Sequence, residues 1–141
     1  MILLDTSVLS LAFRRRRQDE PEPYVVVVLR RMLLEDVSLT VPGIVLQEVL
    51  SGVRTEAQFS RLKSLVEAFP ILMAEPYHHV AAARIANACG HKGVSTSAVD
   101  CLIAALATSS DAPLFTFDED FLRMAPHCGL RLFKVREQRG A

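Results

Sequence analysis

The sequence predicts an α/β fold in which a parallel sheet is covered by helices on both faces. Short apolar runs alternate with longer segments of helical spacing along the chain, and apolar residues make up 50% of its 141 residues. No linker or internal repeat interrupts this alternation. We therefore expect one domain over residues 1–135, followed by a flexible polar tail over residues 136–141.

The first predicted strand is the aliphatic run MILL, residues 1–4, which suits a buried position. Residues 6–13 have the pattern of a helix that either Asp5 or Thr6 can cap. Residues 14–23 are polar and contain two prolines, so they predict a loop.

The next segment, residues 24–35, contains four consecutive valines, which suit a strand as well as a helix. A helix is favoured because Leu29, Met32 and Leu33 continue the apolar pattern at helical spacing. The short run SLTV, residues 38–41, predicts the second strand.

Proline marks the start of the next helix. Pro42 fits the first helical position, where no amide hydrogen is needed, and the helix continues to about residue 53 with Gly52 near its end. The remaining predicted elements are a helix at 56–68, a strand at 70–74, a helix at 76–89, a loop at 90–96, a helix at 97–110, a strand at 112–117, a helix at 118–125 and a strand at 130–135.

Composition limits the class of protein. Sixteen basic residues balance sixteen acidic ones, and a zero net charge neither indicates nor excludes a nucleic-acid partner. No apolar run is long enough to span a membrane, and the N-terminus lacks the pattern of a signal peptide. Three widely spaced cysteines without a CxxC pair fit reduced thiols, so we expect a cytoplasmic protein.

Two aspartates follow predicted strands directly. Asp5 comes after residues 1–4, and Asp118 comes after residues 112–117. In a parallel sheet the carboxyl ends of the strands share one edge, where ligands bind, so both side chains are expected there. Taken alone, each aspartate is explained more readily as a helix N-cap, and the metal-site interpretation depends on the whole set of acids.

Two further acids lie on apolar parts of predicted helices. Glu48 is surrounded by mostly apolar or small residues at turn spacing, although a partly exposed helix acid is the alternative. Asp100 has Ile103 and Ala104 at turn spacing, and burial would raise its pKa. No Lys or Arg occurs between residues 93 and 122 to balance the charge of Asp100. Alternatively, Asp100 could pair with a distant arginine, or it could cap a helix that begins later than predicted.

These four carboxylates predict a metal site if they meet. Four ionised carboxylates within a few ångström require cations. Mg²⁺ and Mn²⁺ prefer such hard oxygen ligands, and they can activate water and neutralise charge on a phosphate as its ester bond breaks. The set therefore predicts a divalent-cation site that is suited to reactions of phosphate esters.

Four pieces of the chain carry a family resemblance: LLDTSVL with Asp5, VPGIVLQEVLSG with Glu48, VDCLIAALA with Asp100 and LFTFDEDF with Asp118. In this order, across almost the whole chain, they resemble the PIN-domain ribonucleases, and specifically the VapC-type toxins of bacterial toxin–antitoxin pairs. Each piece alone is a weak signal, and the ordered set is a strong one.

The resemblance implies a three-layer α/β/α sandwich with a central parallel sheet and Mg²⁺-dependent RNA cleavage, with Mn²⁺ as a substitute. The implied catalytic and metal-binding carboxylates are Asp5, Glu48, Asp100 and Asp118. Asp120 could share or replace the role of Asp118, and the Thr6 and Thr116 hydroxyls would support the acids. The resemblance also implies a homodimer and a cognate antitoxin that inserts a peptide into the acidic groove.

One dense basic run could contact RNA. It consists of Arg14, Arg15, Arg16 and Arg17, and it follows the first strand closely enough to reach the same edge of the sheet. Such a cluster attracts phosphates without regard to sequence. A solvated loop, or a contact for an acidic partner segment, is the alternative.

Functions other than a nuclease fit the sequence less well. A non-catalytic PIN-like module that binds RNA or protein is the main alternative, although none of the four acids is replaced by a neutral residue. An aspartyl phosphatase would need a second Asp where Ser7 stands, and a phospho-accepting receiver would need a lysine after a late strand.

Overall fold

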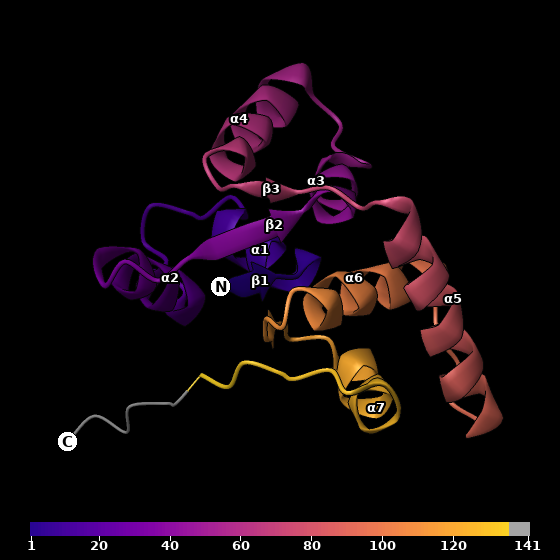
Figure 1. Ribbon diagram of the computed structural model, residues 1–141. Helices are drawn as coiled ribbons and strands as arrows, with labels where there is room; N and C mark the ends of the chain where they lie inside the picture. The colour runs from indigo at the N-terminus through magenta and orange to yellow at the C-terminus, as the bar shows by residue number, and fades with distance from the viewer. Residues whose placement is uncertain (136–141) are drawn as a thin grey trace.

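The computed structural model describes residues 1–135, which form four strands and seven helices (Figure 1). The strands are β1 (Ile2–Leu4), β2 (Leu39–Pro42), β3 (Ile71–Leu72) and β4 (Leu114–Phe115). The helices are α1 (Thr6–Phe13), α2 (Tyr24–Leu34), α3 (Gly43–Leu50), α4 (Glu56–Glu67), α5 (Pro76–His91), α6 (Ala98–Ser109) and α7 (Glu119–Cys128). The tail expected over residues 136–141 lies outside the described residues.

The strands form one parallel sheet in the order β3-β2-β1-β4. In the centre, Leu3 of β1 pairs with Thr40 of β2 on one side and with Leu114 of β4 on the other. Helices connect the strands because a parallel pair cannot be joined by a tight hairpin. The predicted parallel α/β sheet is confirmed, and the carboxyl ends of its strands lie at one edge.

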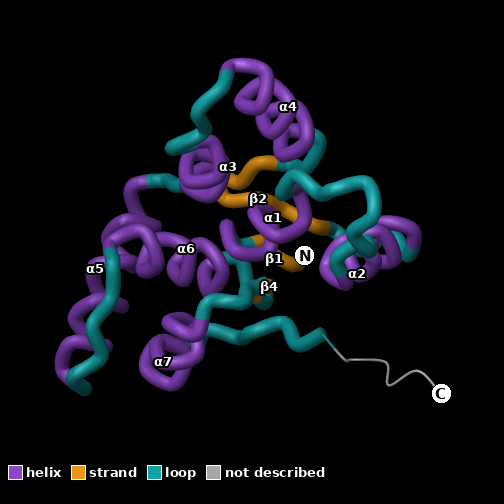
Figure 2. The backbone as a smooth tube through the Cα atoms, turned by 180° about the vertical axis from the view of Figure 1, so that it is seen from behind, coloured by secondary structure: helices purple, strands orange, loops and turns teal. Residues whose placement is uncertain are grey.

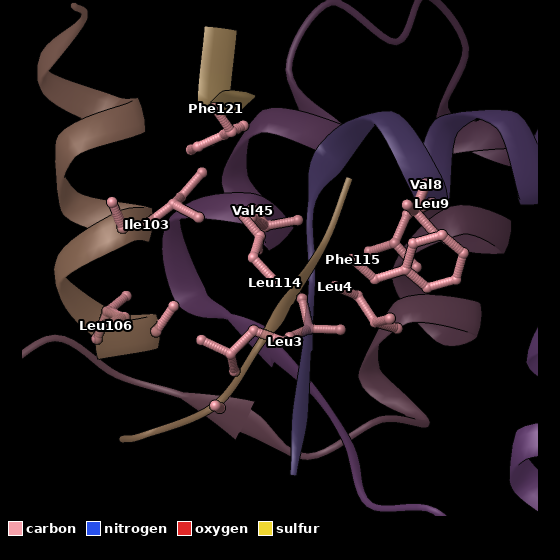
Figure 3. Packing of buried hydrophobic residues seen from close by; sticks show 14 of the residues in the cluster. Leu3, Leu4, Val8, Leu9, Val45, Ile103, Leu106, Leu114, Phe115 and Phe121 are labelled. Atoms are coloured by element: carbon pink, nitrogen blue, oxygen red, sulfur yellow. The ribbon is translucent and has the colours of Figure 1, made fainter. Parts of the chain in front are cut away.

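Helices cover both faces of this sheet, as the predicted three-layer sandwich requires. Successive residues of a strand point to opposite faces, and both Leu3 and Leu4 are fully buried. Figure 3 shows Ile103 of α6 on one side of β1, and Val8 and Leu9 of α1 on the other. Burying each such side chain contributes roughly 2 kcal/mol. Seen from behind in Figure 2, α1 lies in front of β1 and β2.

Local sequence explains where several helices form. In α2 the buried residues are Val25, Leu29 and Met32, spaced four and three positions apart. This is the spacing of one helix face, and the valine-rich segment forms a helix as predicted. In α6 the side chain of Ser97 caps the first turn. The alternative in which Asp100 caps a later-starting helix is therefore wrong.

Pro42 differs from its predicted position. It is the last residue of β2 and the N-cap of α3, with φ −59° and ψ 141°, instead of the first helical residue. The proline ring fixes only φ, and a value near −65° suits an extended strand end as well as a helix start. Pairing of Pro42 with Leu72 of β3 holds the extended conformation.

The two C-terminal strands are shorter than predicted. The strand predicted over residues 112–117 is reduced to β4, because the amide of Phe117 bonds to the hydroxyl of Ser7 instead of to a neighbouring strand. The strand predicted over residues 130–135 is a single bridge between Leu114 and Leu132. With β4 only two residues long, little backbone remains for it to pair with.

The helices are short compared with a bilayer. Among residues 1–135, no helix combines the length and apolar character needed to cross a membrane. The longest, α5, extends two residues past its predicted end.

Cys89 and Cys101 are buried, and the three cysteines are free thiols, as the sequence predicts.

Candidate metal centre

Asp5 stands where β1 ends and α1 begins. The residue is only 4% exposed, and its side chain caps α1 by accepting a hydrogen bond from the Ser7 amide at 3.4 Å. The same oxygen, Oδ2, also accepts bonds from the Ser7 hydroxyl at 2.8 Å and the Thr116 hydroxyl at 2.7 Å. All three bonds use Oδ2, so within the described residues Oδ1 has no donor and is available to a ligand.

The hydroxyls of Ser7 and Thr116 join the ends of β1 and β4. The Ser7 hydroxyl donates to Asp5 and accepts from the Phe117 amide at 3.0 Å. The Thr116 hydroxyl donates to Asp5 and accepts from the Asp118 amide at 3.0 Å. Asp5 and Asp118, 113 positions apart by their numbers, are thereby fixed relative to each other.

Three other carboxylates converge at this edge. Oxygens of Asp100, Asp118 and Asp120 all lie within 4.8 Å of one another, and each side chain is half-buried. Asp118 caps α7 by accepting from the Asp120 amide at 2.9 Å, which fixes its position. Asp100 projects from the first turn of α6. The N-cap interpretation of Asp5 and Asp118 is correct, and it is compatible with their place in the cluster.

The pKa of Asp100 is raised to about 6, chiefly because burial disfavours its charged form. The negative charges of Asp118, Asp5 and Asp120 act in the same direction, while the hydrogen bond from Ser97 opposes it. Within residues 1–135, no cationic side chain contributes to this balance. The predicted rise in pKa is confirmed in direction, and Asp5 is close enough to act on the cluster electrostatically.

Glu48 occupies a different environment from the predicted one. It is exposed on α3, not enclosed by apolar neighbours, and it lies outside the group of three converging aspartates. The Thr6 hydroxyl donates to its Oε1 at 2.7 Å across 42 positions of sequence. Because Thr6 directly follows Asp5, this bond holds Glu48 beside the same edge of the sheet.

Sequence reasoning missed two residues of the site. Ser7 links the two strand ends, as described above. Arg123 forms an ion pair with Asp120 one turn earlier on α7. It lies just past the stretch without Lys or Arg, and its spacing of three residues from Asp120 on a predicted helix was the signal that could have found it.

The arginine run does not meet the acids. The four residues are exposed and follow Phe13, the last residue of α1. An eight-residue helix is about 12 Å long, so the run begins at the end of α1 remote from Asp5. There Arg14 lies 3.8 Å from Glu20, and Arg61 of α4 donates to the Phe13 carbonyl.

The sequence of this chain matches the model of a known protein family. The model described as PIN domain matches residues 2–126, a range that includes all five candidate acids. No curated protein sequence matches the chain. The matched range extends from β1 into α7 and so covers the whole sheet and the candidate metal centre.

Solved structures share the fold. A chain of FitAcB from Neisseria gonorrhoeae has a TM-score of 0.74 at 24% identity, covering 95% of this chain and 97% of its own. A chain of VapBC2 from Rickettsia felis, bound to a DNA fragment from its promoter, has a TM-score of 0.77 at 19% identity, covering 96% and 100%. A chain of VapBC-1 from nontypeable Haemophilus influenzae has a TM-score of 0.74 at 23% identity, covering 94% and 97%.

Proposed function

The chain belongs to the PIN domain family, and from that premise we propose that it is a metal-dependent endoribonuclease, the toxin of a type II toxin–antitoxin pair. One observation carries the proposal: Asp100, Asp118 and Asp120 converge within 4.8 Å, and the charge of Asp5 reaches Asp100. Like charges held this close destabilise the folded chain unless a cation joins them. The arrangement therefore supports cation binding as the task of the site.

The donor atoms suit Mg²⁺ or Mn²⁺. All are carboxylate oxygens, and within residues 1–135 no cysteine or histidine belongs to the converging group. Partial exposure of the aspartates leaves room for the waters that Mg²⁺ usually keeps. The proposed ligands are Asp5, Glu48, Asp100 and Asp118, with Asp120 sharing the role of Asp118.

The chain's own contribution is to hold these oxygens in place before the reaction. When bound, the divalent cation supplies positive charge that offsets the charge developing on a phosphodiester, and it lowers the pKa of the attacking water. The hydroxyls of Ser7 and Thr116 fix one oxygen of Asp5 and leave the other free. The Thr6 hydroxyl orients Glu48, which is exposed and can therefore hold a water or contact the substrate.

We further propose RNA as the substrate, a cognate antitoxin as the protein partner, and the cytoplasm as the place of action. Support for the antitoxin is the similarity in fold to VapBC structures, one of which is described as a member of a family of toxin–antitoxin systems. The exposed arginine run, residues 14–17, remains a proposed second contact for RNA or for an acidic partner segment.

A homodimer is part of the same proposal. Met73, Tyr77 and Val80 are 64%, 62% and 57% exposed. Met73 lies just before α5, and Tyr77 and Val80 lie near its start. Tyr77 and Val80 are one helical turn apart, so they share a face of α5. Large apolar residues grouped on a surface are typical of protein–protein contacts, which supports pairing of two copies through this region.

Metal removal tests the nuclease directly. Purified protein is expected to cleave RNA in Mg²⁺, to stop when EDTA is added, and to recover when Mn²⁺ replaces Mg²⁺, because the donor set accepts either ion. The measurement is the initial rate on a fluorescent RNA, with heat-denatured protein as the control for contaminating nucleases. Cleavage that continues unchanged in EDTA would contradict the proposed reaction.

A further inference from the structure

Beside the metal centre lies a polar hollow that the proposed reaction has not used. It has a volume of about 590 Å³ and is lined by the loop of residues 93–97 together with Asp100, Asp120 and Arg123. Asp100 and Asp120 also belong to the converging carboxylates. The hollow and the metal centre are therefore continuous, and a ligand in one lies beside the other.

Only part of the lining of this hollow can bind an anion. Ser95 and Thr96 supply hydroxyl groups from the loop, whereas the Ser97 hydroxyl is already bonded to Asp100. Among residues 1–135, Arg123 is the only cationic side chain of the lining. The guanidinium is on α7, and its side chain is 59% exposed. Guanidinium groups match the geometry of phosphate with two parallel hydrogen bonds, and hydroxyls can donate the others.

In this structure Arg123 is paired with Asp120, one of the acids of the metal centre. Its guanidinium pairs with Oδ1 of Asp120, three residues earlier on the same helix. One unit of positive charge thus stands against the three converging aspartates. A divalent cation bound to these aspartates competes with Arg123 for Asp120, and a side chain this exposed is free to turn towards the hydroxyls of the hollow.

We propose that Arg123 binds a backbone phosphate of the substrate RNA next to the metal centre, and that it acts as the internal counter-ion of Asp120 when metal is absent. This inference rests on the proposed nuclease function. It predicts a coupling: metal binding frees the guanidinium, so Arg123 contributes to RNA affinity only when the carboxylates hold a cation. A purely structural ion pair would show no such dependence on metal.

The experiment compares Arg123→Ala and Arg123→Lys with Arg131→Ala. Arg131 is a matched control because its side chain is also 59% exposed and paired with an aspartate, Asp111, which precedes β4 at the opposite edge of the sheet. With Mn²⁺, Arg123→Ala should raise the KM for RNA about tenfold with little change in kcat, because a charged phosphate contact is lost. Arg123→Lys should lie between, since it keeps the charge without the planar fork.

Two binding measurements complete the test. Calorimetry should show that Arg123→Ala binds Mn²⁺ as tightly as the wild type or tighter, because a competing cation is gone. In EDTA, the RNA Kd of Arg123→Ala should match that of the wild type. An unchanged KM, weaker Mn²⁺ binding, or an equal loss of RNA affinity with and without metal would overturn the inference.

The outcome also separates this inference from the nuclease proposal. If the wild type binds Mn²⁺ and RNA but does not cleave, the reaction is wrong, and the role of Arg123 is read from the RNA Kd measured in Mn²⁺. If the wild type cleaves and Arg123→Ala behaves like Arg131→Ala, only the role of Arg123 is wrong.

Discussion

Asp100→Asn is expected to abolish Mg²⁺-dependent cleavage while leaving the folded protein as stable as the wild type or more stable. The side chain keeps its shape but loses the charge that the cation requires. A loss of at least roughly 100-fold in rate is expected, because even residues that only support metal ligands cost 10- to 100-fold when changed. Stability does not fall, because the charged form of Asp100 is disfavoured by burial and by the neighbouring aspartates. Cleavage rates and thermal unfolding of the same preparation measure both effects.

Asp36→Asn is the matched control for this substitution. Asp36 is exposed, precedes β2 at the opposite edge of the sheet, and has φ +57°, a conformation that asparagine adopts readily. It should keep full activity and stability. Asp5→Asn should lose cleavage as Asp100→Asn does, because it also removes a charge that the cation requires. Its fold should persist, because the amide oxygen can still accept the bonds from Ser7 and Thr116. Cleavage retained in both Asp5→Asn and Asp100→Asn would rule out the proposed centre.

Metal affinity is expected to fall steeply as the pH drops below about 6, where Asp100 takes up a proton. A ligand must lose its proton to bind the cation, so the Mn²⁺ affinity should decrease up to about tenfold for each unit of pH below that point. Calorimetry between about pH 5 and pH 8 measures this, and the initial rate of cleavage should follow the same curve. In Asp100→Asn this dependence should be lost together with most of the binding.

The same pKa shift makes a prediction for the metal-free protein with the opposite sign. Because the pKa of Asp100 is higher in the folded than in the unfolded chain, ionisation of Asp100 destabilises the fold. That destabilisation is fully present above about pH 6 and is relieved as the pH falls towards the ordinary value of 3.8. Between pH 7 and pH 5, thermal stability in EDTA should therefore rise more in the wild type than in Asp100→Asn. An identical pH dependence of both proteins would contradict the assignment.

Much of the fold was predictable from local sequence. The strand before Asp5, the helix of residues 6–13 and the helix in the valine-rich segment follow from apolar periodicity and capping, and all are confirmed. The predictions that were wrong concern strands that need pairing with distant segments of the chain. The predicted strand over residues 130–135 has the composition of a strand, but β4 offers it only Leu114. Sequence composition does not reveal how much of a neighbouring strand is free.

The site was predictable where chain geometry alone places a residue. Asp5 and Asp118 lie at the same edge because parallel strands end there, and the stretch without Lys or Arg around Asp100 could be read directly from the sequence. Contacts across the fold were not predictable, such as the bond from Thr6 to Glu48 across 42 positions. Ser7 was missed because a serine in the first turn of a helix is ordinary. Its role in linking the strand ends depends on the approach of Phe117, which lies just after β4.

We propose above that acids from separate parts of this chain bind a divalent cation at the carboxyl edge of the sheet. Anomalous diffraction from crystals soaked in Mn²⁺ tests it most directly, because the signal locates the metal without reference to activity. We expect a strong peak between Asp5, Asp100 and Asp118 that is absent from crystals of Asp100→Asn. A peak elsewhere on the molecule, or none at millimolar Mn²⁺ near neutral pH, would contradict it.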